Sequence, residues 1–344
     1  MNPLIWSMMI TGLATSTIIT MSSHHWMLAW LGLELNTLSI LPIIMKSGHP
    51  RSTEATTKYF LIQAAAAALI LFSSAMNAWE TGQWTITHNL SPTAATMITI
   101  ALMMKLGLAP VHAWYPEVLQ SATMNTALVL STWQKLAPLA LLYLMNNNLP
   151  TQIMLIMGLT SALLGGWMGL NQTQTRKIMA FSSIAHMGWL VVALSLSPNL
   201  ALTTTIIYIT MTTTMFMSLG TTTTKTITDL GTTWTQSPPL IMLLVLSLMS
   251  LGGLPPLTGF APKWLILTTL CTMKLMPMSV LLALASLPSL YFYIRMAYMT
   301  TLLSPPATTN TKYKWRLPNT INTMLPPMIM LSALLLPLAP LLPN

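Results

Sequence analysis

The chain has 344 residues, of which 53% are hydrophobic and only 6% are charged, and its mean hydropathy is +0.66. A soluble domain carries roughly 25% charged residues, so this chain cannot coat a water-facing surface and is expected to lie in a lipid bilayer. The formal net charge of +9 does not indicate nucleic-acid binding, because the lysines and arginines form no dense patch interleaved with aromatic residues.

Apolar segments of about 20 residues, the length that spans a bilayer core, recur along the whole chain. No positively charged leader precedes the first of them, which is therefore expected to be kept as a helix. The pattern predicts an all-α polytopic membrane protein with about eleven transmembrane helices. They are placed near residues 3–21, 25–45, 59–79, 92–118, 122–145, 149–170, 177–197, 199–220, 239–273, 276–300 and 324–343.

The basic residues between these segments are distributed unequally. If the segments alternate in direction, the side of the N-terminus carries Lys46, Arg51, Lys58, Arg176, Lys177, Lys225, Arg295, Lys312, Lys314 and Arg316, and the other side carries only Lys274. Basic loops stay in the compartment that retains positive charge. The N-terminus is therefore predicted to face the cytosol or the matrix, and the C-terminus the opposite side.

Two predicted helices contain residues that break helices. The fourth contains Gly107 and Pro110, and the ninth contains Gly253, Pro255 and Pro256. Proline removes an intrahelical donor and clashes with the preceding turn, and glycine loosens the helix. The ninth segment is also too long for one straight crossing. Both helices are therefore expected to be discontinuous.

Both breaks share the pattern Gly-Leu-x-Pro, and they lie five helices apart. An odd separation means that the two helices run in opposite directions. The sequence thus predicts two inverted five-helix repeats, with the functional site at the breaks. In this single membrane domain the first repeat covers 1–147 and the second 148–303, and 304–344 form a loop and a C-terminal transmembrane helix.

Four charged residues lie well inside predicted helices: Glu34, Lys105, Lys135 and Lys263. Each costs about 2.5–3.5 kcal/mol at the centre of an inserted helix, and leucine or methionine would fill the space without that cost. Methionine occurs 30 times, so apolar filler was available. These four residues are predicted to face the bundle interior and to transfer protons. The alternative is an ion pair that only fixes the helix register.

A lysine paired with a carboxylate suggests how such a site would work. Burial disfavours the charged amine, and a nearby carboxylate stabilises it. At about 6 Å and an effective dielectric of about 20, one pairing is worth about 2.8 kcal/mol. Moving or neutralising Glu34 would therefore let Lys105 release its proton. Lysines on three helices could relay that event, and broken helices would admit water from each side in turn.

Two histidines are further candidates for proton relay. His186 lies in the middle of the seventh predicted helix, the repeat partner of the helix that holds Glu34, and histidine titrates near neutral pH. His112 follows Pro110 and could link the first break to one surface. For each, the alternative is a hydrogen-bonded histidine with a structural role. Glu117, at a helix end, is interpreted as a solvated or capping residue.

Sequence motifs for redox cofactors are absent. The chain has no Gly-x-Gly-x-x-Gly, P-loop or His-Glu-x-x-His motif, and Cys271 is its only cysteine. The chain itself is therefore not expected to bind a nucleotide, a flavin, an iron–sulfur cluster or a metal, and Cys271 is interpreted as a packing residue. In a redox machine, the electrons would be handled by other subunits.

Three segments resemble a known family. They are the run from Met104 to Val118 (MKLGLAPVHAWYPEV), the run from Ser182 to Gly188 (SSIAHMG) and the run from Gly252 to Trp264 (GGLPPLTGFAPKW). Together with the Met- and Thr-rich composition, they are similar to NADH–ubiquinone oxidoreductase chain 2, a mitochondrially encoded, antiporter-like subunit of the membrane arm of respiratory complex I. The similarity runs over the whole chain.

The resemblance implies a proton-pumping subunit of the mitochondrial inner membrane, with two inverted repeats, an N-terminus in the matrix and a C-terminus in the intermembrane space. It resembles the shortened animal form that lacks the first three helices of bacterial relatives. The family's glutamate–lysine pair falls on Glu34 and Lys105, its connecting lysine on Lys135, and the lysine of the second broken helix on Lys263.

The resemblance also implies partners. They are the neighbouring antiporter-like and small core subunits of complex I and phospholipids, with no nucleic acid. NADH, FMN, iron–sulfur clusters and ubiquinone would be bound by other subunits. The residues alone leave two other functions open: an Mrp-type cation/proton antiporter subunit, and a scaffold whose lysines form silent ion pairs.

Overall fold

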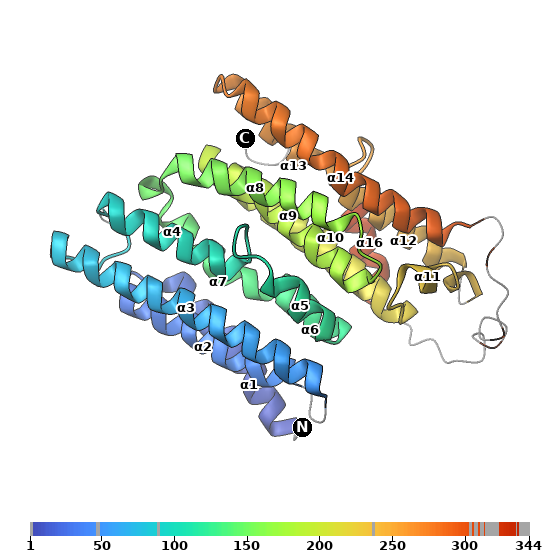
Figure 1. Cartoon of the computed structure of the whole chain (residues 1–344), viewed down its shortest axis with the longest axis horizontal. Coiled ribbons are helices and arrows are strands. Elements are labelled where there is room, and N and C mark those ends of the chain that lie inside the picture. The colour runs from blue at the N-terminus through green and yellow to red at the C-terminus, as the bar shows by residue number, and fades with distance from the viewer. Residues whose placement is uncertain are drawn as a thin grey trace. The chain divides into compact units, whose positions relative to one another are not determined.

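The computed structural model describes residues 3–45, 49–87, 90–235, 238–302 and 323–334, together with residues 305, 309, 313 and 336. The described chain is almost entirely helical (Figure 1). It forms two compact units, Met1–Ser161 and Ala162–Asn344. The predicted loop residues Lys46, Lys312, Lys314 and Arg316, and residues 335 and 337–343 of the last predicted helix, lie outside the described residues.

In the first unit, α1 packs on α2, and α3 packs on both α2 and α4. Gly32 allows the close approach of α1 and α2, because a Cβ atom there would lie 2.5 Å from Thr20 Cγ2. The helices are α1 (Pro3–Ser22), α2 (Trp26–Ile44), α3 (Pro50–Thr81), α4 (Pro92–Leu106), α5 (Trp114–Ser121), α6 (Met124–Ser131), α7 (Trp133–Leu144), a 3-10 turn η1 (Asn146–Asn148), and the first part of α8 (Thr151–Gly169).

In the second unit, α9 is buried on nearly all sides and packs against α10, α13 and α14. The end of α8 lies against it, because a Cβ atom on Gly165 would be only 2.7 Å from the Ala185 nitrogen. The helices are α9 (Thr175–Leu196), α10 (Pro198–Thr222), α11 (Ile227–Leu230), a 3-10 turn η2 (Thr233–Thr235), α12 (Pro238–Gly252), α13 (Phe260–Thr272), α14 (Met276–Thr300) and α16 (Leu325–Leu334).

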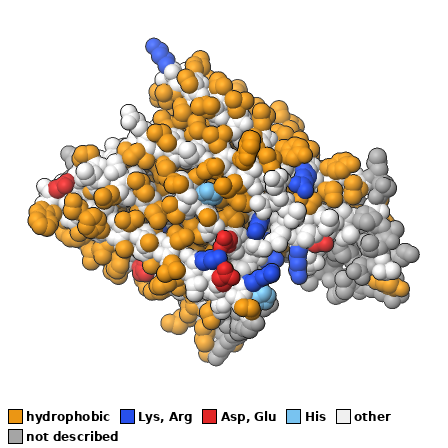
Figure 2. Space-filling view, in the orientation of Figure 1, with side chains coloured by type: hydrophobic (Ala, Val, Ile, Leu, Met, Phe, Trp, Pro, Cys, Tyr) orange, Lys and Arg blue, Asp and Glu red, His pale blue; other side chains and the backbone are white. Residues whose placement is uncertain are grey.

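The all-α, multi-pass membrane class is confirmed. Among the described residues, eight helical segments are long and apolar enough to cross a bilayer, and three shorter apolar helices begin at 92, 239 and 325. Each of these segments falls on one of the predicted transmembrane helices. Hydrophobic side chains dominate the face shown in Figure 2, as expected for a surface in contact with lipid or with other apolar subunits. The number of crossings, like the boundaries of the two repeats, stays a prediction.

Both predicted discontinuous helices are present. α4 ends at Leu106, before Gly107 with φ +75°, and α5 begins seven residues after Gly107, at Trp114. α12 ends at Gly252, before Gly253 with φ +78°, and α13 begins at Phe260. Glycine is the residue that adopts this left-handed conformation without steric cost, so each helix ends where a glycine permits the chain to turn.

One predicted helix start was wrong, and one predicted helix is interrupted. α3 begins at Pro50 rather than at 59, because an apolar window detects only the bilayer part of a helix that is 32 residues long. Its polar first turns are supported by Pro50 at the start and by the i,i+4 ion pair between Glu54 and Lys58. The helix predicted over 122–145 is interrupted at Thr132, where the hydroxyls of Ser131 and Thr132 both donate to the Leu128 carbonyl.

Candidate functional site

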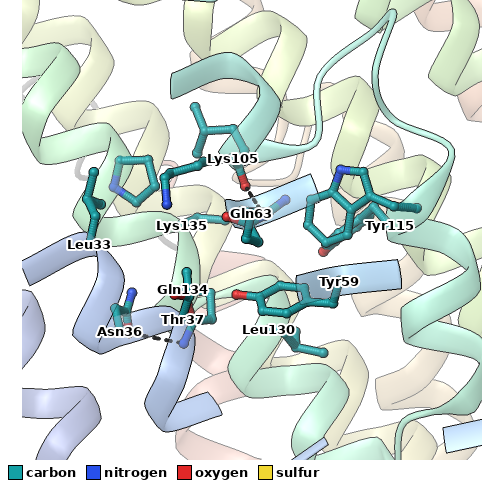
Figure 3. Close-up of a pocket in the computed structure, with 13 residues that line it drawn as sticks. Leu33, Asn36, Thr37, Tyr59, Gln63, Lys105, Tyr115, Leu130, Gln134 and Lys135 are labelled. Carbon is teal, nitrogen blue, oxygen red and sulfur yellow. Dashed lines mark hydrogen bonds between the residues drawn. The ribbon is translucent and has the colours of Figure 1, made fainter. Parts of the chain in front are cut away.

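The first unit contains a small cavity, lined by polar and apolar side chains, beside the first helix break (Figure 3). Its volume is about 20 Å³, which is enough for a water molecule. α2, α3, α4, α5, α6 and α7 all contribute to its walls. The lining residues are Leu33, Asn36, Thr37, Tyr59, Gln63, Lys105, Leu106, Trp114, Tyr115, Leu130, Gln134, Lys135 and Pro138. Two of the four predicted charges, Lys105 and Lys135, therefore line one cavity.

Lys105 lies in the last turn of α4, one residue before the helix ends, and is 6% exposed. Its carbonyl has no donor four residues later within α4, because the helix stops at Leu106. Gln63 Nε2 donates to that carbonyl at 3.4 Å. Within the described residues, Lys105 Nζ has no hydrogen-bond partner. The C-terminal end of α4 thus places the Lys105 amine in the cavity, and Gln63 of α3 holds that helix end through its hydrogen bond.

Lys135 enters the same cavity from α7 and is 4% exposed. Its amine lies 4.9 Å from the centre of the Tyr115 ring, so the negative face of that ring stabilises the charge. The preceding residue, Gln134, donates through Nε2 to Asn36 Oδ1 at 3.1 Å, which ties α7 to α2 (Figure 3).

Glu34 lies on α2, half-buried, close to the cavity but outside its lining. Its charge acts on both Lys105 and Tyr59. Among the described residues it forms no ion pair within 4.0 Å, and its buried Oε2 atom has no hydrogen-bond partner. The structure therefore brings Glu34 and Lys105 into electrostatic range without joining them in a direct ion pair.

The second unit contains a similar cavity, also of about 20 Å³, beside the second helix break. Lys263, in the first turns of α13, donates through Nζ to the Gly252 carbonyl at 2.9 Å. Because α12 ends at Gly252, this carbonyl accepts no hydrogen bond from a later turn of the helix. The lysine amine donates to it instead. The lining residues are His186, Trp189, Leu190, Thr204, Tyr208, Met211, Gly259, Pro262, Lys263 and Ile266.

His186 and Lys263 line this second cavity together, from α9 and α13. His186 Nε2 lies 3.3 Å from the hydroxyl of Tyr293 on α14, and its ring centre is 6.0 Å from that of Tyr208 on α10. The sequence singled out His186 and Lys263 but neither tyrosine. Tyrosine is common in helix packing, so nothing in the local sequence separates these two from packing residues.

His112, the other candidate for proton relay, and Glu117, interpreted as a solvated or capping residue, both lie outside the lining of the cavities. His112 is buried in the segment between α4 and α5, with Nδ1 3.2 Å from the Pro110 carbonyl. Glu117, in the first turn of α5, is exposed, and its Oε2 accepts from Lys58 Nζ at 2.7 Å. Glu117 therefore anchors the helix that follows the first break to α3.

Nothing in the described part of the chain gathers three or more histidine, cysteine or acidic side chains in a metal-binding arrangement. Cys271 is not disulfide-bonded, and its thiol lies 3.7 Å from Ser279 Oγ. That this chain binds no cofactor of its own stays a prediction.

The sequence and the fold match one class of membrane protein. A family model described as NADH:quinone oxidoreductase/Mrp antiporter, TM matches residues 23–289, and one described as NADH dehydrogenase subunit 2 C-terminus matches residues 290–343. The chain is thus an antiporter-like, multi-pass membrane protein. The similarity of the fold extends to a chain of respiratory complex I from Thermus thermophilus, with a TM-score of 0.85 at 24% identity, covering 97% of this chain and 78% of that chain.

The relatives narrow the class to a family. The chain is 51% identical over 342 residues to NADH-ubiquinone oxidoreductase chain 2 of Struthio camelus, covering 99% of each. It is 50% identical over 342 residues to the Xenopus laevis protein of the same name, again covering 99% of each. This chain belongs to the NADH-ubiquinone oxidoreductase chain 2 family, and the resemblance seen in the sequence is confirmed.

Proposed function

We propose that this chain is the proton-translocating, antiporter-like subunit of the membrane arm of mitochondrial NADH:ubiquinone oxidoreductase (complex I). One observation carries the proposal: each unit holds, beside its broken helix, a small cavity lined by at least one lysine. A buried lysine is costly in a membrane protein, and a water-sized space next to it is what a proton needs to reach the amine.

In the first unit, Lys105 takes up a proton while the Glu34 carboxylate stabilises the charged amine. When Glu34 moves or is neutralised, the proton passes to Lys135 through the cavity that both lysines line. The ring face of Tyr115 stabilises the charge on Lys135 after the transfer. The break at Gly107 and Pro110 lets α4 and α5 adjust separately, so that water reaches Lys105 from one side at a time.

In the second unit, Lys263 discharges the proton at the break formed by Gly253, Pro255 and Pro256. His186 lines the same cavity and relays protons to or from Lys263. His112, in the segment after the first break, provides a second relay toward one surface. The direction of transfer is from the matrix to the intermembrane space.

The subunit acts in the mitochondrial inner membrane, with its N-terminus in the matrix. This orientation is supported by the excess of lysine and arginine predicted on that side. Its partners are neighbouring antiporter-like and small core subunits, and phospholipids. NADH, FMN, iron–sulfur clusters and ubiquinone are bound by other subunits, whose redox reaction drives the translocation.

A second candidate is an Mrp-type cation/proton antiporter subunit. It is supported by the description of the matching family model and by a fold similar to a chain of the Mrp complex from Dietzia sp. DQ12-45-1b. That likeness has a TM-score of 0.78 at 17% identity and covers 87% of this chain and 61% of that chain. The full-length relatives at about 50% identity favour complex I.

Assembly is tested first. Mitochondrial inner membranes are solubilised mildly, separated on a native gel and stained for NADH dehydrogenase activity, and the active band is analysed by mass spectrometry. Complex I membership predicts this chain in the active band in stoichiometric amount. Migration alone, or with antiporter subunits only, would exclude the redox assignment.

Transport is tested with Lys105→Met, which keeps the apolar stem and removes the charge. We expect normal assembly, with fewer protons translocated per NADH oxidised. The matched control is Lys274→Met, because Lys274 is exposed and lies at the turn after α13. A scaffold would instead lose assembly and pumping in proportion. The transport role is refuted if the Lys105→Met complex assembles and pumps like the control.

A further inference from the structure

Tyr293 extends the polar site of the second unit beyond its cavity. It lies on α14 and is 1% exposed, among the largest fully buried side chains of the described residues. Its hydroxyl lies 3.3 Å from His186 Nε2, so it joins α14 to α9 at this site. A Cβ atom added at Gly252 would lie 3.8 Å from the ring, so Tyr293 sits beside the carbonyl that holds Lys263.

A phenol is suited to this place because its hydroxyl both donates and accepts. When His186 is protonated, Nε2–H donates to Tyr293 Oη. When Nε2 is unprotonated, the phenol proton turns to Nε2. The phenol is neutral in both states, and it stays hydrogen-bonded to Nε2 in both.

We propose that Tyr293 is a positioning residue for proton transfer in the second unit: it holds His186 against the Lys263 cavity in both protonation states of the imidazole. This inference rests on the proposed function and names a residue that the function did not require. The described titratable groups around His186 are Lys263 on α13, Tyr208 on α10 and Tyr293 itself. Tyr293 is hydrogen-bonded to Nε2.

The corresponding helices of the two units support the same assignment. In the first unit, the predicted third and fifth transmembrane helices supply Tyr59 and Lys135 to the cavity. In the second, the predicted eighth helix, α10, supplies Tyr208 to the cavity, and the predicted tenth helix, α14, supplies Tyr293, which contacts His186 outside the lining. A polar side chain from the last helix of each predicted repeat thus completes each site, and in the second unit that side chain is Tyr293.

The test is Tyr293→Phe in the assembled complex, because this change removes one oxygen and keeps the ring. Tyr291→Phe is the matched control: Tyr291 lies on the same helix and is 59% exposed. We expect normal assembly on a native gel and a fall of about fivefold in the rate of proton translocation, the size set by one hydrogen bond. The pH profile of translocation is expected to change shape in Tyr293→Phe and to stay unchanged in Tyr291→Phe.

A double variant separates positioning from packing. If Tyr293 acts through His186, adding Tyr293→Phe to His186→Leu causes no further loss, whereas a packing role would reduce translocation or assembly in both backgrounds. Lys263→Met is the reference for the proposed function. If the Lys263→Met complex translocates protons at the unmodified rate, the proposed transport function of this site is overturned. If Lys263→Met impairs proton translocation but Tyr293→Phe translocates protons like Tyr291→Phe, only the inference about Tyr293 is overturned.

Discussion

The amine of Lys135 lies 4.9 Å from the centre of the Tyr115 ring. The two residues come from different parts of the first site. Tyr115 lies in α5, the helix that follows the break, and Lys135 lies in α7. Because Tyr115 directly follows Trp114, which packs edge-on to it and to Tyr59 of α3, an aromatic cluster links the segment after the break to the charge on α7.

Tyr115→Leu removes the ring face and is expected to weaken the charged form of Lys135 by about 2 kcal/mol, the strength of a desolvated cation–π contact. Fewer protons should be translocated per NADH oxidised, measured in sealed vesicles. Tyr115→Phe keeps the ring and serves as the control, with translocation close to that of the unmodified chain. Equal losses in both variants would place the role of Tyr115 in its hydroxyl rather than in its ring.

Gln63→Leu removes the amide that donates to the Lys105 carbonyl. A buried carbonyl without a donor costs about 1–3 kcal/mol, so we expect a lower midpoint of thermal inactivation together with reduced proton translocation. Gln152→Leu, at an exposed position of α8, is the control for the loss of a glutamine side chain. A Gln63→Leu complex as stable and active as the control would show that the end of α4 is held by other contacts.

The contrast between Lys105 and Gln63 shows what the sequence could and could not predict. Charged residues in apolar helices stand out because of their insertion cost, and Gly107 and Gly253 mark local breaks, so these were predicted from short windows. Gln63 contacts a residue 42 positions away, and Tyr293 one that is 107 positions away. Such contacts depend on the packing of distant helices, which no local pattern encodes.

The same limit applies to the ends of helices. The start of α3 at Pro50 and the interruption at Thr132 involve polar residues, which an apolar window excludes or averages out. The class of the fold follows from composition and from the length of the apolar segments. The lining of each cavity follows only from how the helices pack.

Glu117→Gln is expected to loosen α5 without changing the cavity's chemistry. Lys58 Nζ contacts Glu54 Oε1 at 2.6 Å on its own helix and Glu117 Oε2 at 2.7 Å on α5. Glu117 therefore provides the ionic link between the two helices. Amide hydrogen exchange in residues 114–121 of the assembled complex should become faster, because α5 loses this anchor.

Glu54→Gln is the matched control for that experiment, since it weakens the ion-pair network but keeps the contact between α3 and α5. Exchange in residues 114–121 should then stay close to that of the unmodified chain. The effect of Glu117→Gln should also diminish at high ionic strength, because exposed charges are screened. Equal exchange in both variants would mean that aromatic packing alone holds α5.

A comparison of Gly107→Ala with Gly82→Ala separates two effects of the added Cβ atom. One is the conformational free energy of placing alanine in left-handed backbone, and the other is steric crowding of Trp114 and Tyr115. Both glycines have left-handed backbone, with φ +75° at Gly107 and +72° at Gly82. Each alanine variant therefore carries a conformational cost of about 1 kcal/mol. At Gly82 a Cβ atom meets nothing within 4 Å, whereas at Gly107 it would lie 3.3 Å from Trp114 Cζ2 and 3.4 Å from Tyr115 Cβ.

We therefore expect Gly82→Ala to lower the thermal stability of the complex slightly and to leave proton translocation per NADH unchanged. Gly107→Ala should lower stability further and reduce translocation, because Trp114 and Tyr115 line the first cavity and must shift to make room. Thermal inactivation and proton translocation are measured on the same preparations. If both variants lose translocation equally, the left-handed backbone itself is responsible, and the packing of Trp114 and Tyr115 against the break plays no part in transfer.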